Sequence, residues 1–222
     1  MCVTQPDKHT IIESSRRFQE RSSIFRPFFE FLLLVTYGTV FTVTPRLARL
    51  VFLPTFGWNL LLGRVFKVRN WWDAVEPRLL LGARPLRRDV ATFSNLQIDS
   101  VVNLCEEFRG PVDLYAKYSI QQLWLPTTDF QPPSLEQIDQ GVEYIEARLN
   151  QATTNHGKVY VHCKAGRARS ATIVLCWMIK YRGMTSESAQ RRLLEVRPHV
   201  NPSLHQRPVI REFEQLFTTK SV

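Results

Sequence analysis

The chain has 222 residues, of which 44% are hydrophobic and 22% charged, and its net charge is +9. This length suits one domain of ordinary size with an appendage, and the hydrophobic content excludes an intrinsically disordered protein. The four cysteines show no paired spacing and form no ligand cluster with histidines. We therefore expect a reducing compartment and predict neither a bound metal nor a cofactor.

The positive charge is distributed unevenly along the chain. Residues 1–70 contain ten Lys and Arg against four Asp and Glu, whereas residues 71–222 contain nineteen against sixteen. The same N-terminal third holds the most apolar runs, and this combination favours an anionic membrane surface over nucleic acid as a partner. A solvated basic face that serves solubility is the alternative interpretation.

The N-terminal third divides into a polar tail, residues 1–26, and an apolar, basic segment, residues 27–66. The acidic residues of the tail argue against a transit peptide. The most apolar run, residues 28–43, is shorter than the ~20 residues that a spanning helix needs. A second run, residues 47–65, has cations at both ends, which is typical of a segment lying in the membrane interface. A single span, an interfacial position and folding back of both runs onto the domain are all compatible with these patterns.

The globular domain is predicted over residues 71–219, and it alternates strands with helices. The expected strands are residues 79–82, 101–104 and 120–125 and a short buried strand from Val159. The expected helices are residues 89–96, the stretch after the capping box Ser134/Gln137, residues 171–181, a helix from Thr185 or Ser186 to Val196, and a last helix from about Pro208. This alternation predicts an α/β fold with a mostly parallel sheet flanked by helices, whose functional groups lie at the carboxyl ends of the strands.

Two helices carry more detailed expectations. Asp89 is the predicted N-cap of the helix that ends at Leu96. In the last helix, Val209, Phe213 and Leu216 are expected to face the core because they recur at helical spacing.

The stretch from Val159 to Ser170, VYVHCKAGRARS, is predicted to form a strand, a tight loop and the start of a helix. A cysteine in such a loop is surrounded by backbone N–H groups at the positive end of a helix dipole, which binds an anion and stabilises a thiolate. Arg169, six residues after Cys163, offers paired donors that match two phosphoryl oxygens. This spacing is that of the cysteine-dependent phosphatases, and a buried structural thiol is the alternative.

The motif gives its members separate roles. Cys163 attacks phosphorus as a thiolate, and water later cleaves the phosphocysteine. Ser170 can donate a hydrogen bond to the sulfur, and His162, which precedes the loop, is expected to order it. The rest of the phosphate-binding loop is Lys164, Ala165, Gly166, Arg167 and Ala168. Its two cations are expected at the rim, where they favour a substrate with more than one negative group.

Departure of the alkoxide requires a proton, which a carboxylic acid on a nearby loop can supply. Asp129 is the acid in the predicted loop over residues 126–133, and it is our candidate. An Asp that caps a turn is the alternative interpretation. Glu106 and Glu107, at the end of another predicted strand, are rival acids, and Asp113 is a weaker one.

The loop HCKAGRARS resembles that of the dual-specificity branch of the protein tyrosine phosphatase superfamily. Within that branch, the chain is similar to the mitochondrial phosphatases that act on phosphatidylglycerophosphate. Three further stretches carry the similarity, namely residues 47–55 with 63–65, residues 79–86 and residues 125–129, and the whole covers residues 47–217. The chain departs from that family at residues 105–109, where Cys-Glu-Glu-Phe-Arg replaces Asn-Glu-Glu-Tyr-Glu.

The resemblance implies a dual-specificity phosphatase fold over residues 71–219 and hydrolysis of an anionic phospholipid at a membrane surface. The implied reaction converts phosphatidylglycerophosphate to phosphatidylglycerol, and the implied location is the mitochondrial inner membrane. Phosphoinositides are close competitors as substrates, and a protein tyrosine, serine or threonine phosphatase and a catalytically silent membrane adaptor are further alternatives. An RNA 5′-phosphatase is disfavoured because the basic residues are not interleaved with stacking aromatics. No nucleic-acid partner is expected, and no oligomeric state is predicted.

Overall fold

The computed structural model describes residues 55–66, 69–151 and 157–218, which all belong to a compact unit comprising residues 44–222. Its centre is a five-stranded sheet with the strand order β1-β2-β5-β3-β4. The strands are β1 (Trp72–Glu76), β2 (Leu79–Gly82), β3 (Ile98–Cys105), β4 (Gln121–Thr127) and β5 (Lys158–His162). β1 runs antiparallel to β2, and every other neighbouring pair is parallel. The predicted α/β fold with a mostly parallel sheet is therefore confirmed.

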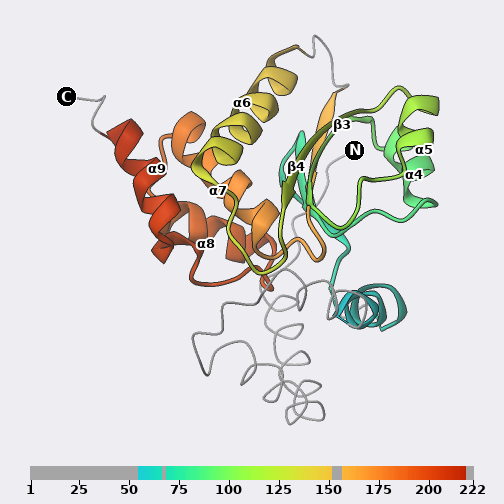
Figure 1. Ribbon diagram of the computed structural model, residues 1–222, viewed down its shortest axis with the longest axis horizontal. Helices are drawn as coiled ribbons and strands as arrows, with labels where there is room; N and C mark the ends of the chain where they lie inside the picture. The colour runs from blue at the N-terminus through green and yellow to red at the C-terminus, as the bar shows by residue number, and fades with distance from the viewer. Residues whose placement is uncertain (1–54, 67–68, 152–156, 219–222) are drawn as a thin grey trace, which may run out of the picture. The chain divides into compact units, whose positions relative to one another are not determined.

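Helices cover both faces of this sheet (Figure 1). The α-helices with assigned bounds are α4 (Asp89–Asn95), α5 (Val112–Lys117), α6 (Leu135–Gln151), α7 (Arg169–Arg182), α8 (Ser186–Val196) and α9 (Pro208–Thr218). A π-helical turn η2 (Leu61–Val65) and a 3-10 turn η3 (Leu204–Gln206) complete the described elements. α4 and α5 lie on one face, and α6, α7, α8 and α9 lie on the other. β1, α5 and the two short turns were not predicted from the sequence.

The main core lies between the sheet and the layer built around α7. Strands β3 and β5 are central and almost wholly buried, as expected for parallel strands covered on both faces. α7 is buried from Arg169 to Ile179 because it packs on the sheet and also contacts α6, α8 and α9. A helix that is enclosed in this way is apolar around most of its circumference. The burial of α7 fixes the position of its first residues, which follow the predicted phosphate loop.

The predicted helix ends are mostly found where the sequence placed them. Ser134 and Gln137 form the expected capping box, in which the Gln137 N–H donates to Ser134 Oγ at 3.2 Å. Thr185 caps α8, and Gly183 ends α7 with a left-handed φ of 61°. The prediction that Asp89 is the N-cap of this helix was wrong. Asp89 is the first residue of α4, and its carboxylate accepts a hydrogen bond from the Leu86 N–H at 2.8 Å.

The expected inward face of α9 needs one correction. Phe213 is buried as predicted, but Leu216 is exposed, and the buried partner of Phe213 is Ile210, three residues before it. Val209 and Phe217 are partly buried against the same core, so the inward face of α9 includes Val209 as predicted but is turned away from Leu216.

Of the second apolar run, residues 47–65, the structure describes the part from Thr55 onward. Residues 55–66 form a helical segment whose Phe56 is buried against Trp71 and Ala83, so this part folds back onto the domain. At the end of this segment, Val65 and Phe66 are 65% and 50% exposed. Within the described ranges, no helix has the length and apolar character needed to cross a bilayer. The run over residues 28–43 lies outside the described residues.

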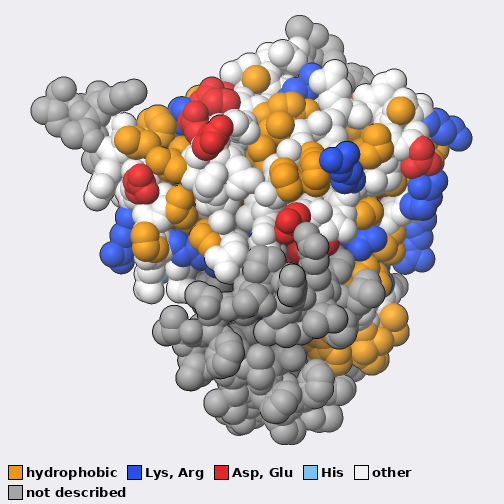
Figure 2. Space-filling model, in the orientation of Figure 1, with side chains coloured by type: hydrophobic (Ala, Val, Ile, Leu, Met, Phe, Trp, Pro, Cys, Tyr) orange, Lys and Arg blue, Asp and Glu red, His pale blue; other side chains and the backbone are white. Residues whose placement is uncertain are grey.

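Charged and apolar side chains are mixed on the face shown in Figure 2. Lys and Arg gather along the margin over α4 and α5, where Arg87, Arg88 and Lys117 are exposed. Apolar side chains elsewhere on this face are interspersed with polar ones, as is normal for a protein surface. This margin is therefore the basic side of the visible surface.

Candidate active site

The loop between β5 and α7 places Cys163 at the carboxyl end of a central strand. β5 ends at His162, and α7 begins at Arg169, so six residues form the turn. Gly166 has a φ of 66°, and a Cβ there would lie 2.5 Å from the backbone oxygen of Gly82. Only glycine fits this conformation and this close approach, which lets the loop curl round Cys163 beside the end of β2.

The Cys163 sulfur is surrounded by hydrogen-bond donors. Ser170 Oγ donates to Sγ at 3.2 Å, and the backbone N–H groups of Ser170 and Ala165 also donate to it. Burial alone would raise the pKa of Cys163. The Arg169 guanidinium and these donors lower it by more than burial raises it, so that the pKa falls to about 7. The sulfur is therefore largely ionised slightly above neutral pH, as a nucleophilic cysteine requires.

Arg169 lies at the centre of the same edge, with its guanidinium only 2% exposed. One terminal nitrogen donates to Glu107 Oε2 at 3.2 Å and to the Thr127 carbonyl at 2.6 Å. The other donates to Asp129 Oδ1 at 2.9 Å. Although burial lowers its pKa, the surrounding thiols and carboxylates raise the pKa of Arg169 above its ordinary value. The guanidinium is therefore a fixed cation beside the sulfur.

The candidate acids lie in different surroundings. Asp129 is buried and forms ion pairs with both Arg169 and Lys164. Glu107 also binds Arg169, whereas Glu106 accepts a hydrogen bond from Thr128 Oγ1 at 2.9 Å. The fourth candidate, Asp113, is exposed on α5 and forms an ion pair with Arg87, away from these groups.

The backbone after Asp129 is strained. Phe130 has a φ of 68°, which is unusual for a bulky residue and costs on the order of 1–3 kcal/mol. Its N–H donates to Asp129 Oδ1 at 3.2 Å, so this conformation helps to hold the carboxylate in place. Such strain is typical of functional loops, because the surrounding structure must maintain it.

His162 is fully buried at the end of β5, behind the loop. Its Nδ1 lies 3.4 Å from the Cys163 carbonyl oxygen, and its ring packs against Tyr160 with centroids 5.7 Å apart. Burial lowers the pKa of His162 to about 3, so the ring is neutral at physiological pH. A neutral ring in this position can support the loop backbone.

The two loop cations, Lys164 and Arg167, lie in different surroundings. Lys164 is buried, and its Nζ binds Asp129 and donates to Thr55 Oγ1 at 2.9 Å. Arg167 is exposed, and its Nε donates to the His199 carbonyl at 2.8 Å. The expectation that both cations lie at the rim is therefore wrong for Lys164. Ala168 directly precedes α7 and completes the turn.

Arg197 binds the backbone of the loop and was not predicted as a site residue. Its Nε donates to the Gly166 carbonyl at 3.0 Å and one terminal nitrogen donates to the Ala165 carbonyl at 3.1 Å. Its charge is paired with Asp73, and the side chain is 1% exposed. Arg197 directly follows the end of α8, and no local sequence pattern marks its contact with the loop 31 residues earlier.

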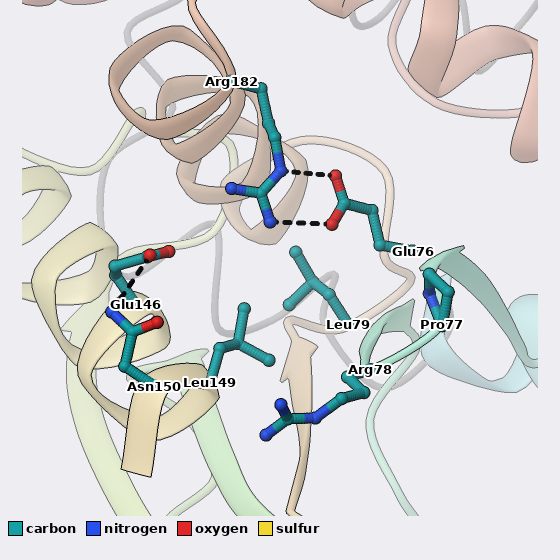
Figure 3. Close-up of a pocket in the computed structure, with 8 residues that line it drawn as sticks. All are labelled: Glu76, Pro77, Arg78, Leu79, Glu146, Leu149, Asn150 and Arg182. Atoms are coloured by element: carbon teal, nitrogen blue, oxygen red, sulfur yellow. Dashed lines mark hydrogen bonds and ion pairs between the residues drawn. The ribbon is translucent and has the colours of Figure 1, made fainter. Parts of the chain in front are cut away.

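A separate hollow of about 260 Å³ lies at the opposite, amino edge of the sheet (Figure 3). Its lining residues are Glu76, Pro77, Arg78, Leu79, Glu146, Leu149, Asn150 and Arg182. Arg182 and Glu76 point toward each other and form a two-bond ion pair. None of the predicted site residues lines this hollow.

The fold and the cysteine loop define a phosphatase of a known class. The model of the dual specificity phosphatase catalytic domain matches residues 79–216, and the chain belongs to this family. It is therefore a phosphomonoesterase. The matched residues lie within the domain that the sequence predicts over residues 71–219.

More specific similarities connect the chain to one group of these enzymes. It is 36% identical over 171 residues to the phosphatidylglycerophosphate phosphatase PTPMT2 of Arabidopsis thaliana, covering 76% of this chain and 73% of that protein. It is 31% identical over 188 residues to the human phosphatidylglycerophosphatase and protein-tyrosine phosphatase 1, covering 79% and 90%. The crystal structure of PTPMT1 in complex with PI(5)P matches with a TM-score of 0.61 and 27% identity, covering 69% of this chain and all of that chain.

Proposed function

We propose that this phosphatase hydrolyses the terminal phosphate of an anionic phospholipid and converts phosphatidylglycerophosphate to phosphatidylglycerol. The observation that carries this proposal is the similarity to the Arabidopsis and human phosphatidylglycerophosphate phosphatases, which extends over more than three quarters of the chain. We expect the reaction at a membrane surface, and the family resemblance favours the mitochondrial inner membrane.

The segment before the family domain supports a lipid substrate. Thr55 and Asn59 both contact Lys164, the residue after Cys163, through Thr55 Oγ1 at 2.9 Å from Nζ and Asn59 Nδ2 at 3.4 Å from the carbonyl. The same segment ends at the exposed Val65 and Phe66. A segment that contacts the catalytic loop and also exposes apolar side chains is suited to a substrate embedded in a membrane.

The proposed chemistry proceeds through a phosphocysteine. The phosphate monoester binds to the loop N–H groups and to Arg169, and the Cys163 thiolate attacks phosphorus as the ester P–O bond breaks. Asp129 gives its proton to the departing alkoxide, and as a carboxylate it then takes a proton from the attacking water. Water cleaves the P–S bond, and Ser170 stabilises the departing thiolate by its hydrogen bond to the sulfur.

The contacts of Asp129 are consistent with this sequence of events. In the described state its carboxylate binds the two cations, Arg169 and Lys164, that a phosphate would also seek. An incoming phosphate monoester competes for both cations and leaves the Asp129 carboxylate beside the ester oxygen. There the carboxylate takes a proton from solvent before it protonates the departing alkoxide. Glu107 stays on the other side of Arg169 and keeps the guanidinium oriented.

The test is a phosphate-release assay on the full chain with short-chain phosphatidylglycerophosphate, phosphatidylinositol monophosphates and a phosphotyrosine peptide. We expect kcat/KM for phosphatidylglycerophosphate to exceed the others by at least about tenfold. A preference for phosphatidylinositol monophosphates would move the function to phosphoinositide metabolism. A preference for the peptide would refute the lipid proposal, and the Cys163→Ser variant provides the background rate for each substrate.

A further inference from the structure

The side chain of Arg84 is held between two aromatic rings. Its guanidinium carbon lies 3.8 Å from the centre of the Phe108 ring and 4.6 Å from that of Phe56. Stacking on two rings fixes the plane of the guanidinium, so its donors point in defined directions. Such an arrangement prepares an arginine for a planar, two-bond contact with an anion.

Arg84 lies next to the catalytic loop. It follows the carboxyl end of β2, the strand that pairs with β5, and its N–H donates to the Lys164 carbonyl at 3.3 Å. Phe108 directly follows Glu107, which binds Arg169. Phe56 directly follows Thr55, which binds Lys164. The two rings therefore come from the two segments that border the phosphate loop.

The charge of Arg84 is not balanced by a carboxylate in the part of the chain that the structure describes. Among the described residues, no carboxylate forms an ion pair with it, and its buried Nε has no hydrogen-bond partner. Burial lowers its pKa, which the Cys105 thiol and the Glu107 carboxylate partly counteract. Removing a cation from water without a partner is unfavourable, and contacts with aromatic rings offset only part of this. A bound anion would supply the missing partner.

We propose that Arg84 binds the second phosphate of the substrate, the phosphodiester of the lipid head group, while Arg169 and the loop bind the phosphomonoester. This inference rests on the proposed function, because a phosphatidylglycerophosphate head group carries both groups on one three-carbon glycerol. The sequence suggested that Lys164 and Arg167 favour a substrate with more than one negative group. The present proposal assigns this role to Arg84 instead. The structure favours Arg84 because Lys164 Nζ binds Asp129 and Thr55 and, like Arg169, would meet the phosphomonoester that displaces Asp129.

The test uses two soluble substrates that contain no acyl chain. One is the deacylated head group, glycerophosphoglycerol phosphate, which has a monoester and a diester, and the other is glycerol 3-phosphate, which has the monoester alone. Wild type should prefer the head group, and Arg84→Gln should lower its kcat/KM by about 10- to 100-fold, mainly through KM. The same variant should change kcat/KM for glycerol 3-phosphate by less than about twofold.

Two further variants serve as controls. Arg88→Gln removes the same charge from an exposed position four residues away and should leave both substrates unaffected. Arg84→Lys keeps the charge but loses the planar, stacked group, so it should give an intermediate loss on the head group. An equal loss on both substrates in Arg84→Gln would show that Arg84 only supports the loop, and no loss on either would remove it from substrate binding.

The outcomes separate this inference from the proposed function. If wild type hydrolyses the phosphotyrosine peptide better than the lipid, the lipid function fails, yet the head-group comparison still reports whether Arg84 binds a second phosphate. If Arg84→Gln hydrolyses both the lipid and the head group at wild-type rates, only the role of Arg84 is refuted.

Discussion

The two edges of the sheet carry similar charged side chains in very different surroundings. At the carboxyl edge, Arg169 and Arg197 are 2% and 1% exposed, and each binds carboxylates and backbone carbonyls together. At the amino edge, Arg182 and Glu76 are 39% and 31% exposed and mainly neutralise each other through two hydrogen bonds of 2.9 Å (Figure 3).

This difference indicates which charges serve function. An exposed ion pair contributes little free energy, and its removal leaves no charge stranded in the interior. A buried arginine is retained against a desolvation penalty, so its surroundings must supply enough partners. At the carboxyl edge those partners include the nucleophile and the candidate acid, whereas at the amino edge the described hydrogen-bond partners of Arg182 are Glu76 and the Tyr181 carbonyl.

The largest expected effect is that of Cys163→Ser. Because the hydroxyl is a poor nucleophile without a base, turnover should fall by a factor on the order of 10⁴ or more, as measured by phosphate release. The matched control is Cys176→Ser, which alters a buried thiol on α7 and should keep activity within a few-fold of wild type. Comparable turnover in the two variants would contradict a nucleophilic role for Cys163.

Arg169→Lys should have the next largest effect. Lysine keeps the positive charge but cannot present paired donors, so kcat should fall by about 10²–10³-fold. Arg182→Lys makes the same change at the amino edge and should leave kcat unaltered. Similar losses in the two variants would show that the contrast between the edges does not extend to catalysis.

Asp129→Asn tests the assignment of the acid. It should slow hydrolysis of phosphatidylglycerophosphate by about 10²-fold, because the alkoxide needs a proton to leave. With p-nitrophenyl phosphate the loss should be much smaller, since p-nitrophenolate leaves without a proton. An equal loss on both substrates would transfer the role to another acid, and Glu107→Gln and Glu106→Gln would then be compared in the same assay.

The contrast between the edges also predicts different effects on stability. Arg197→Met leaves the largely buried Asp73 carboxylate unpaired and should lower the free energy of unfolding by about 3–5 kcal/mol. Arg182→Met removes a partly exposed ion pair and should lower it by only about 0–1 kcal/mol. Urea unfolding of both variants measures the two losses, and equal values would refute the distinction.

Much of the fold was predictable because its signals are local. The alternation of strands and helices, the capping box at Ser134 and the glycine after α7 all lie within a few residues of what they determine. The strand β1 was missed because Trp72–Glu76 is only partly buried and contains two acidic residues, whereas the equally short β2 and β5 are almost wholly apolar or buried. α5 has six residues and no side-chain cap, so it shows no helix start signal.

The site was predictable where one motif contains its parts. Cys163, Arg169 and Ser170 lie within eight residues, and the loop brings them together as the spacing implied. The prediction of Asp129 as the acid depended on the expectation that the carboxyl ends of parallel strands meet at one edge of the sheet. Arg197 and Arg84 could not be identified in this way, because their importance comes from contacts with Gly166, Phe56 and other residues far away in the sequence.

The most direct test of the account is the ionisation of Cys163 in the folded protein. The rate of its alkylation by iodoacetamide should rise with pH to a midpoint of about 7, since the thiolate reacts and its pKa is lowered by Arg169 and Ser170. Burial raises the pKa of Cys105 and Cys176, so these thiols should stay unmodified. Ser170→Ala should move the midpoint upward. A wild-type midpoint at or above the ordinary value of 9.0 would contradict the account, because no thiolate would then be available near neutral pH.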